Sequence, residues 1–507
     1  MVYLGLWFSL SAFQLTDTLL LLGHYLRQFL YGFRETRDDL YTINVFGSFG
    51  VIAVRIENDK NRKFFIGVWI KGRYNRSRKD RYEVRIAFFK TCLPNRPAAK
   101  RPRTCSEGRR RRAMAFVLKV RIVTFARNCG FMIDFKRLPS PCYVLDERSL
   151  LNNLHIIDRV RRESGAEIIV ALKACAMWSV FPMLAAHSDG ATASSAAEAR
   201  LVWEEFGVRA HTYAPAYTDR DFDKILQYSD YITFNSLNQF TRFGARAIMS
   251  GISCGLRINP GWSPVTTELY NPCSPASRLG IPASELRELP PGIEGLHFHN
   301  LCESEAADLK TTLEIVERDF GHLLGKIKWV NMGGGHLMTR QGYDTDLLVE
   351  TLVSFRGRHP GLRVIMEPGS AFTWRTGYLV SSVEDIVRNG NSVTAMLDVS
   401  FACHMPDCLE MPYKPGVLNA RDPAPGERGW RLGGNSCLAG DWCGEWVFER
   451  EPRMGDRIVF EDMIHYTMVK TTMFNGVRHP SIAIARTDGS VDIIREFGYE
   501  DYRDRMS

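Results

Sequence analysis

The hydrophobic positions of residues 139–375 fall into short apolar runs that alternate with longer amphipathic stretches. The apolar runs lie at residues 168–172, 211–214, 231–234, 255–258, 295–298, 328–332 and 363–366. Stretches with helical spacing lie between several of them, at residues 221–228, 306–324 and 346–355. Because strands and helices alternate in this way, the pattern predicts a parallel sheet, most economically a (β/α)8 barrel over residues 139–372.

After residue 375 the pattern changes to strands and turns without long helices. Strand-like runs lie at residues 379–387, 393–399, 457–460, 481–485 and 491–494. They predict a C-terminal all-β domain over residues 373–507, and we expect a short strand near residues 139–146 to join it.

The first part of the chain has a different composition. Residues 1–113 hold 23 Lys and Arg against 9 Asp and Glu, whereas the remaining residues hold 42 against 48. The basic stretch at residues 60–112 could be a tail for nucleic acid or an anionic surface. The alternative is that it has no designed role and that Met114 serves as a start. We favour the second interpretation and expect residues 1–113 to be a poorly ordered, non-catalytic extension.

Nucleic-acid and membrane partners are disfavoured by the same patterns. The body of the chain is mildly acidic, which suits a small cationic substrate better than nucleic acid. The apolar residues 1–33 are interrupted by Asp17 and His24, so no run reaches the length of a membrane span. The twelve cysteines include no CxxC pair, which favours free thiols, a cytoplasmic location and no metal site.

Polar and glycine-rich features recur at the ends of the predicted barrel strands. Lys173, Arg257, His299, residues 333–335 (Gly-Gly-Gly) and Glu367 each follow or end an apolar run. In a barrel the carboxyl ends of the strands meet on one face, where the loops assemble an active site. We therefore expect these residues to lie together.

Their chemistry matches the needs of an aldehyde cofactor that carries a phosphate. A lysine at a buried strand end has a lowered pKa and suits Schiff-base chemistry, although Lys173 could also extend to the surface. The glycine run lets backbone N–H groups approach an anion. His299 can stack on a ring, and Glu367 can pair with a ring nitrogen, unless it is only a turn carboxylate before Pro368.

The order of these motifs resembles the fold-type III pyridoxal-phosphate decarboxylases, an alanine racemase-like (β/α)8 TIM barrel group that includes ornithine and diaminopimelate decarboxylases. Within the group, the motif sequences are most similar to those of the carboxynorspermidine (carboxyspermidine) decarboxylases. The segments that carry the likeness are Ala171-Leu172-Lys173, Trp178-Ser179-Val180-Phe181, Ser194-Ser195 with Glu198, Phe234-Asn235-Ser236, His297-Phe298-His299-Asn300-Leu301-Cys302-Glu303, Trp374-Arg375-Thr376-Gly377, Cys437-Leu438-Ala439-Gly440-Asp441 and Thr472-Met473-Phe474-Asn475-Gly476.

The resemblance implies a role for each matching position around pyridoxal 5'-phosphate. It makes Lys173 the Schiff-base lysine, His299 the stacking residue and Glu367 the partner of the ring nitrogen. The remaining cofactor contacts that it implies are Arg257, Gly334, Gly335 and Tyr466. It also implies a homodimer with shared sites.

The catalytic acid and the substrate contacts follow from the same resemblance. Cys437 would reach into the partner subunit's site and return a proton after CO2 leaves. The positions expected to bind substrate are Arg278, Glu303, Asp398 and Asp441.

One position departs from the ornithine decarboxylase pattern. Ser370 stands where those enzymes carry an arginine for the phosphate, so the phosphate would depend more on backbone amides. Acidic residues near the motifs suit a long cationic substrate, or are simply solvated: Glu303, Glu305, Asp407 and Glu410.

We therefore expect decarboxylation of carboxynorspermidine or carboxyspermidine to norspermidine or spermidine. The alternatives are a diaminopimelate decarboxylase and a catalytically silent protein that binds a partner.

Overall fold

The computed structural model describes residues 133–411 and 413–507, together with five strands nearer the N-terminus. These five strands form an antiparallel sheet in the order β1-β5-β4-β3-β2. Their bounds are β1 (Tyr3–Leu6), β2 (Tyr41–Ser48), β3 (Val51–Asn58), β4 (Lys63–Trp69) and β5 (Glu83–Phe89). They belong to a compact unit of residues 1–130, separate from the unit of residues 131–507. The rest of the predicted extension lies outside the described residues, so its low order stays a prediction.

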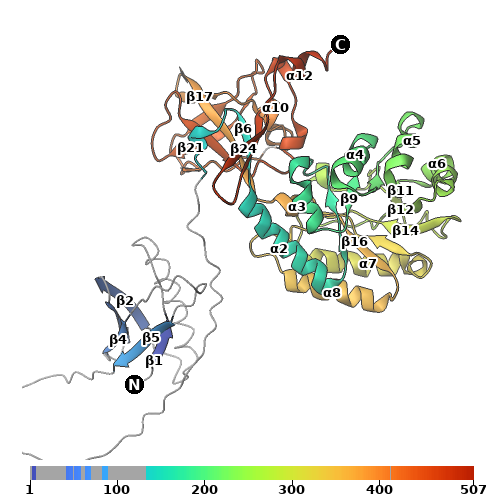
Figure 1. Ribbon diagram of the computed structural model, residues 1–507, viewed down its shortest axis with the longest axis horizontal. Helices are drawn as coiled ribbons and strands as arrows, with labels where there is room; N and C mark the ends of the chain where they lie inside the picture. Colours follow the sequence, from blue (N-terminus) through green and yellow to red (C-terminus); the bar gives the residue numbers. More distant parts are fainter. Residues whose placement is uncertain are drawn as a thin grey trace, which may run out of the picture. The chain divides into compact units, whose positions relative to one another are not determined.

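A parallel barrel forms the larger part of the second unit (Figure 1). Its sheet runs in the order β7-β16-β15-β14-β12-β11-β10-β9-β8. Only Ile169 separates β7 from β8, so the two act as one strand that pairs with β16 on one side and β9 on the other and closes the barrel. The bounds are β7 (Glu167–Ile168), β8 (Val170–Ala171), β9 (Ala191–Ala193), β10 (Ala210–Tyr213), β11 (Ser229–Phe234), β12 (Ser253–Asn259), β14 (Ile293–His297), β15 (Trp329–Asn331) and β16 (Arg363–Met366). A short strand, β13 (Ile281–Pro282), pairs with β12.

Helices surround the strands. They are α2 (Glu147–Ser164), α3 (Phe181–Ala186), α4 (Ala196–Leu201), α5 (Asp219–Tyr228), α6 (Leu237–Met249), α7 (Ala306–Leu324), α8 (Thr345–Arg358) and α9 (Ser370–Thr373). Local sequence sets several of their ends. The Asp146 side chain caps α2 by accepting from the Arg148 N–H, and Gly165 ends that helix with a φ of 65°.

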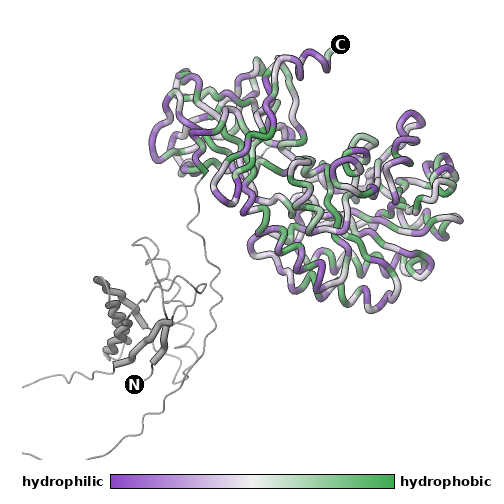
Figure 2. Tube along the Cα trace, viewed as in Figure 1, coloured by the Kyte–Doolittle hydropathy of each residue, from purple (hydrophilic) through white to green (hydrophobic). Residues whose placement is uncertain are grey.

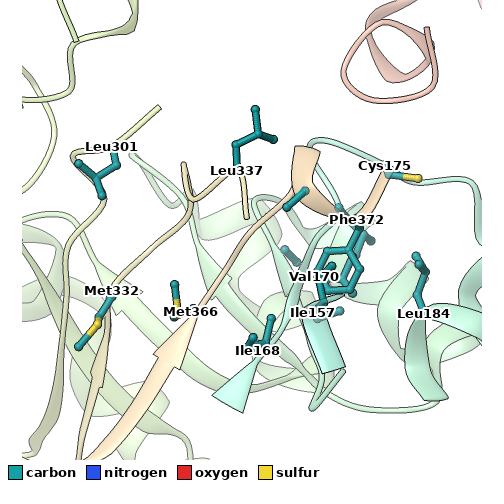
Figure 3. Close-up of a cluster of buried hydrophobic side chains, with 14 of the residues drawn as sticks. Ile157, Ile168, Val170, Cys175, Leu184, Leu301, Met332, Leu337, Met366 and Phe372 are labelled. Atoms are coloured by element: carbon teal, nitrogen blue, oxygen red, sulfur yellow. The ribbon is translucent and has the colours of Figure 1, made fainter. Parts of the chain in front are cut away.

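One large cluster of buried apolar side chains holds these elements together. Buried residues of the strands, such as Ile168 and Val170, share it with helix residues such as Ile157 and Leu184. Figure 3 shows part of this cluster, including Met332 and Met366 at the barrel strands β15 and β16. Hydrophobic stretches run along the strands, and hydrophilic residues are frequent on the outer turns of the helices (Figure 2).

A second, mixed sheet follows the barrel. Its order is β19-β21-β20-β18-β17-β6-β23-β24, and β22 pairs with β17. The bounds are β6 (Cys142–Asp146), β17 (Gly377–Asn389), β18 (Ser392–Leu397), β19 (Ala420–Arg421), β20 (Trp430–Gly433), β21 (Trp442–Phe448), β22 (Arg457–Glu461), β23 (Ser481–Ala485) and β24 (Val491–Arg495). Three short helices lie in this part: α10 (Phe401–His404), α11 (Asp407–Glu410) and α12 (Tyr499–Arg503). β6 precedes the barrel in sequence yet pairs with β17 and β23, so it ties the two sheets together.

The predicted fold class, a (β/α)8 barrel followed by a β domain, is confirmed. The domain boundaries at residues 139–372 and 373–507 stay a prediction, because both sheets lie in one compact unit. Within the described residues, no helix combines the length and the apolar character needed to cross a bilayer.

Candidate active site

A cavity opens at the carboxyl ends of the barrel strands. Among the predicted residues, the cavity lining includes Lys173, His299, Glu303, Gly334, Gly335, Glu367, Ser370 and Tyr466. They come from loops after β8, β14, β15 and β16 and from the β domain. The expectation that strand-end features meet on one face therefore agrees with the geometry, while the role of each residue stays a prediction.

Lys173 and His299 face each other in this cavity. Lys173 Nζ lies 3.3 Å from His299 Nε2. His299 Nδ1 lies 3.1 Å from the Gly334 nitrogen and 3.2 Å from the Gly334 carbonyl oxygen, so the glycine turn holds the imidazole ring in place. Burial lowers the pKa of Lys173; Glu367 opposes this effect and Arg257 adds to it. In its neutral form this amine can attack an aldehyde.

The histidine is held and kept neutral by its surroundings. Burial lowers the pKa of His299 well below its usual value, and the charges of Lys173 and Arg257 lower it further. Arg257 Nη2 donates to the His299 carbonyl oxygen at 3.0 Å. The guanidinium carbon of Arg257 lies 4.7 Å from the ring centroid of Tyr213. Arg257 is thus placed beside the cavity, where it orients the backbone of His299.

The glycine run forms a tight turn that only glycine can make. Gly333 and Gly335 have φ of 67° and 90°, a region that side chains strain. A Cβ on Gly334 would lie 2.4 Å from the Glu367 carbonyl oxygen, and one on Gly335 would lie 2.1 Å from that of Leu301. Without side chains, the backbone of this turn can approach an anion closely.

Glu367 lies buried after β16. Asn331 Nδ2 donates to its Oε1 at 2.5 Å, and His297 Nε2 lies 3.8 Å from its Oε2. Burial alone raises the pKa of Glu367, but His297, Lys173 and the bond from Asn331 lower it by more. The carboxyl group is therefore ionised, and its Oε2 stays available to a cationic N–H donor.

These groups fit pyridoxal phosphate. The cavity offers a lysine of lowered pKa for the aldehyde, a glycine turn for the phosphate, a neutral imidazole and a buried carboxylate for the ring nitrogen. Tyr466 also lines the cavity, with a backbone φ of 52°. Burial raises the pKa of its phenol, and nearby Cys302, Glu303 and Asp407 raise it further, so it remains a hydrogen-bond donor.

Several predicted residues lie away from the cavity of their own chain. Cys437 is exposed, and its backbone N–H donates to Asn475 Oδ1 at 2.9 Å. Arg278 is exposed, and its carbonyl oxygen accepts from Asn235 Nδ2 at 2.9 Å. Their predicted roles require either a second subunit or a bound substrate.

The two aspartates predicted to bind substrate are engaged in the β domain. Asp398 Oδ1 accepts from the Ser381 hydroxyl and the Ser382 N–H, each at 2.9 Å. Asp441 is buried, and its carboxylate accepts from the N–H groups of Ala402 and Ser436. These bonds position backbone around the sheet, so a role toward substrate stays a prediction for both.

The acidic residues near the motifs divide into two groups. Glu305 caps α7 and pairs with Arg340, which occupies its carboxylate. Glu303 lines the cavity, while Asp407 and Glu410 both contact Lys470. The suggestion that these acids are only solvated surface therefore fits Glu305 best.

Sequence reasoning missed some of the cavity lining. Cys302 and His336 have no predicted role, although Cys302 lies inside the histidine motif and His336 directly follows the glycine run. Asn331, which holds Glu367, was also missed. Its position two residues before the first glycine was the available signal. Within the described residues, no three His, Cys, Asp or Glu side chains group as metal ligands.

Comparison with known proteins identifies the family. A model described as "Pyridoxal-dependent decarboxylase, C-terminal sheet domain" matches residues 50–464. The chain belongs to this family. It is a pyridoxal-phosphate-dependent decarboxylase with a barrel and a C-terminal sheet domain.

Three similar proteins refine the comparison. Carboxyaminopropylagmatine decarboxylase of Synechocystis sp. is 52% identical over 384 residues, which cover 76% of this chain and 99% of the relative. Carboxynorspermidine/carboxyspermidine decarboxylase of Campylobacter jejuni is 40% identical over 380 residues, 73% of this chain and 98% of the relative. A crystal structure of the Campylobacter jejuni carboxynorspermidine decarboxylase with norspermidine has a TM-score of 0.68 at 39% identity, and it covers 73% of this chain and 100% of that one.

Proposed function

We propose that this decarboxylase removes CO2 from the amino-acid end of a carboxylated polyamine, carboxynorspermidine or carboxyspermidine, and releases norspermidine or spermidine. The observation that carries the proposal is a match at 40% identity that covers 98% of a relative named for both substrates. The cavity supports the proposal, because Lys173, His299 and Glu367 suit decarboxylation chemistry and the acidic Glu303 lines the same cavity.

The chain's own residues prepare this reaction. When bound, the cofactor acts as an electron sink for the bond to the lost carboxylate. Lys173 would hold the cofactor through its aldehyde, and His299 Nε2 lies 3.3 Å from the lysine amine. The ionised Glu367 would hold the ring nitrogen, where its negative charge would favour a bound proton. The thiol of Cys437 returns a proton to the substrate carbon.

A second candidate substrate has a specific observation behind it. The relative at 52% identity is named for carboxyaminopropylagmatine, which ends in a guanidinium group instead of an ammonium group. Diaminopimelate decarboxylases are neighbours at 17% identity with a TM-score of 0.63, a likeness that shows the fold alone. We therefore favour carboxynorspermidine or carboxyspermidine, and also carboxyaminopropylagmatine, over diaminopimelate as the substrate.

We also infer a homodimer with shared active sites and a cytoplasmic location. The exposed Cys437 lies next to Leu438, which is 46% exposed, and is bonded to Asn475, which adjoins the 50% exposed Phe474. Such an apolar surrounding suits burial against a second copy. The described cysteines are unpaired thiols, which suits a reducing compartment.

A substrate panel tests the proposal. The full-length enzyme with its cofactor is offered carboxynorspermidine, carboxyspermidine, carboxyaminopropylagmatine, meso-diaminopimelate and ornithine, and CO2 release and product mass are measured. We expect turnover of the carboxylated polyamines. The Lys173→Ala variant is the inactive control. Turnover of diaminopimelate alone, with lysine as product, would contradict the proposal. Preference for carboxyaminopropylagmatine would select the second candidate.

A further inference from the structure

A lysine of the β domain lies at the rim of the cavity, next to the lining residue Tyr466, and pairs with two carboxylates. Lys470 ends the short helix η5 (Met468–Lys470), and its backbone N–H donates to the Tyr466 carbonyl oxygen at 3.1 Å. It therefore lies one helical turn beyond a tyrosine that lines the cavity. Its ammonium group donates to the Asp407 carboxylate and to Glu410 Oε2, the latter at 2.8 Å. Asp407 and Glu410 are three residues apart in α11, so they share a face.

These three side chains lie where the β domain meets a barrel loop. Tyr270 ends the helix η4 (Glu268–Tyr270), between β12 and β14. Burial raises the pKa of Tyr270, Asp407 raises it further and Lys470 lowers it. Asp407 is also among the charges that raise the pKa of Tyr466, after burial and nearer groups. The charge of Asp407 thus acts both on Tyr466, which lines the cavity, and on Tyr270 of a barrel loop.

The trio of Lys470, Asp407 and Glu410 carries one positive and two negative formal charges. Burial alone lowers the pKa of Lys470, but its bonds to Asp407 and Glu410 outweigh that effect, so the ammonium form persists. The side chains of Lys470 and Asp407 are 35% and 18% exposed, which leaves the pair open to exchange with another cation. A polyamine tail has the same chemistry as this lysine, an ammonium group on a chain of methylenes.

We propose that Lys470 is a specificity-determining residue that competes with the distal cation of the substrate for Asp407 and Glu410. Its presence reduces the negative charge that a bound tail meets at the rim, and so limits how tightly highly charged tails bind. The inference rests on the proposed function, because only a substrate with a cationic tail reaches these carboxylates. An ion pair that served structure alone would give no dependence on the charge of the tail.

The test compares Lys470→Met with Lys470→Arg in the full-length enzyme with its cofactor. Methionine keeps an unbranched side chain without the charge, so the tail gains both carboxylates. We expect the KM for the carboxylated polyamine to fall about tenfold in Lys470→Met, with a smaller change for an analogue whose tail lacks the distal cation. Since the product carries the same tail, kcat does not rise. Lys470→Arg keeps the charge and the KM of the wild type.

A matched control and a binding measurement complete the design. Lys328 pairs with Glu294 just before β15, at the amino ends of the strands, so Lys328→Met removes a similar ion pair far from the rim and leaves KM unchanged. Should Lys470→Met lose turnover, its dissociation constant for spermidine replaces KM and is expected to fall likewise. An unchanged or raised KM in Lys470→Met, with an active wild type, overturns the inference alone. A wild type that decarboxylates no carboxylated polyamine overturns the proposed function with it.

Discussion

At the scale of single residues, burial and nearby charges set the pKa values of the Lys173 amine and the Glu367 carboxylate. Lys173 and Glu367 both have lowered pKa values, the first because burial disfavours the ammonium form and the second because nearby donors outweigh burial. Burial thus favours the neutral form of the amine, while the carboxylate is ionised around neutral pH. Such separation of protonation states is what acid–base assignments at an active site depend on.

Glu367→Gln tests the carboxylate. Glutamine keeps the size but cannot hold a proton on the ring nitrogen by charge, so we expect kcat to fall about 100-fold while the cofactor stays bound. Steady-state CO2 release and cofactor absorbance measure the two effects. Glu294→Gln is the matched control, since Glu294 pairs with Lys328 and accepts from the Ser253 hydroxyl at the amino ends of the strands, away from the cavity. An unchanged kcat in Glu367→Gln would remove this residue from the mechanism.

The lowered pKa of Lys173 predicts a pH dependence. Only the neutral amine attacks an aldehyde, so the rate at which enzyme stripped of cofactor takes up pyridoxal phosphate rises with pH and levels off at the folded-state pKa. Because burial lowers that pKa, we expect the plateau below the ordinary lysine value of 10.5. Stopped-flow absorbance gives the rate, and N-acetyl-lysine gives the reference curve. A rate that still climbs at the reference value would show an exposed, ordinary lysine.

At the scale of elements, the turn after β15 is the feature that shapes the phosphate side of the cavity. We expect Gly334→Ala to weaken cofactor affinity at least tenfold, because the added Cβ would lie 2.4 Å from the Glu367 carbonyl oxygen and push the turn out of place. Equilibrium dialysis of the cofactor measures this. The control is Gly357→Ala in α8, where no atom lies within 4 Å of the added Cβ, and the helix gains up to about 1 kcal/mol of stability. Equal affinity in both variants would contradict the assignment.

Elements with a strong local pattern were predictable from the sequence, and short ones were not. The helix at residues 306–324 and the strand at residues 481–485 were predicted with the observed bounds. β9, only three residues long, was missed because Ala191-Thr192-Ala193 has little apolar weight. β21 was missed because Gly444 and Glu445 interrupt its apolar run.

The residues of the candidate site also differ in how far they could be predicted from the sequence. Strand-end residues such as Lys173 and Glu367 were predictable because parallel strands bring their ends together whatever the loops do. The contact of Lys470 with Asp407 was not predictable, since it joins two very short helices whose residues are 63 positions apart. Likewise, no local sequence pattern shows that the Asp441 carboxylate accepts hydrogen bonds from backbone N–H groups.

At the scale of the whole molecule, one chain has a cavity with the cofactor groups but without the predicted acid. Mixing Lys173→Ala with Cys437→Ala tests whether the acid comes from a second copy. Random re-association of dimers would restore about a quarter of the wild-type activity, because half of the dimers then hold one intact site. CO2 release from the mixture after mild dissociation and reassembly measures this. Activity no higher than in either variant alone would mean that the sites are not shared.

The whole account depends on a covalent bond between the cofactor and one amine. Borohydride reduction of the enzyme with its cofactor, followed by proteolysis and mass spectrometry, shows which lysine carries the pyridoxyl group. The account predicts the group on Lys173 alone, the amine that lies 3.3 Å from His299 Nε2. A pyridoxyl group on any other lysine, or none after reduction, would contradict it.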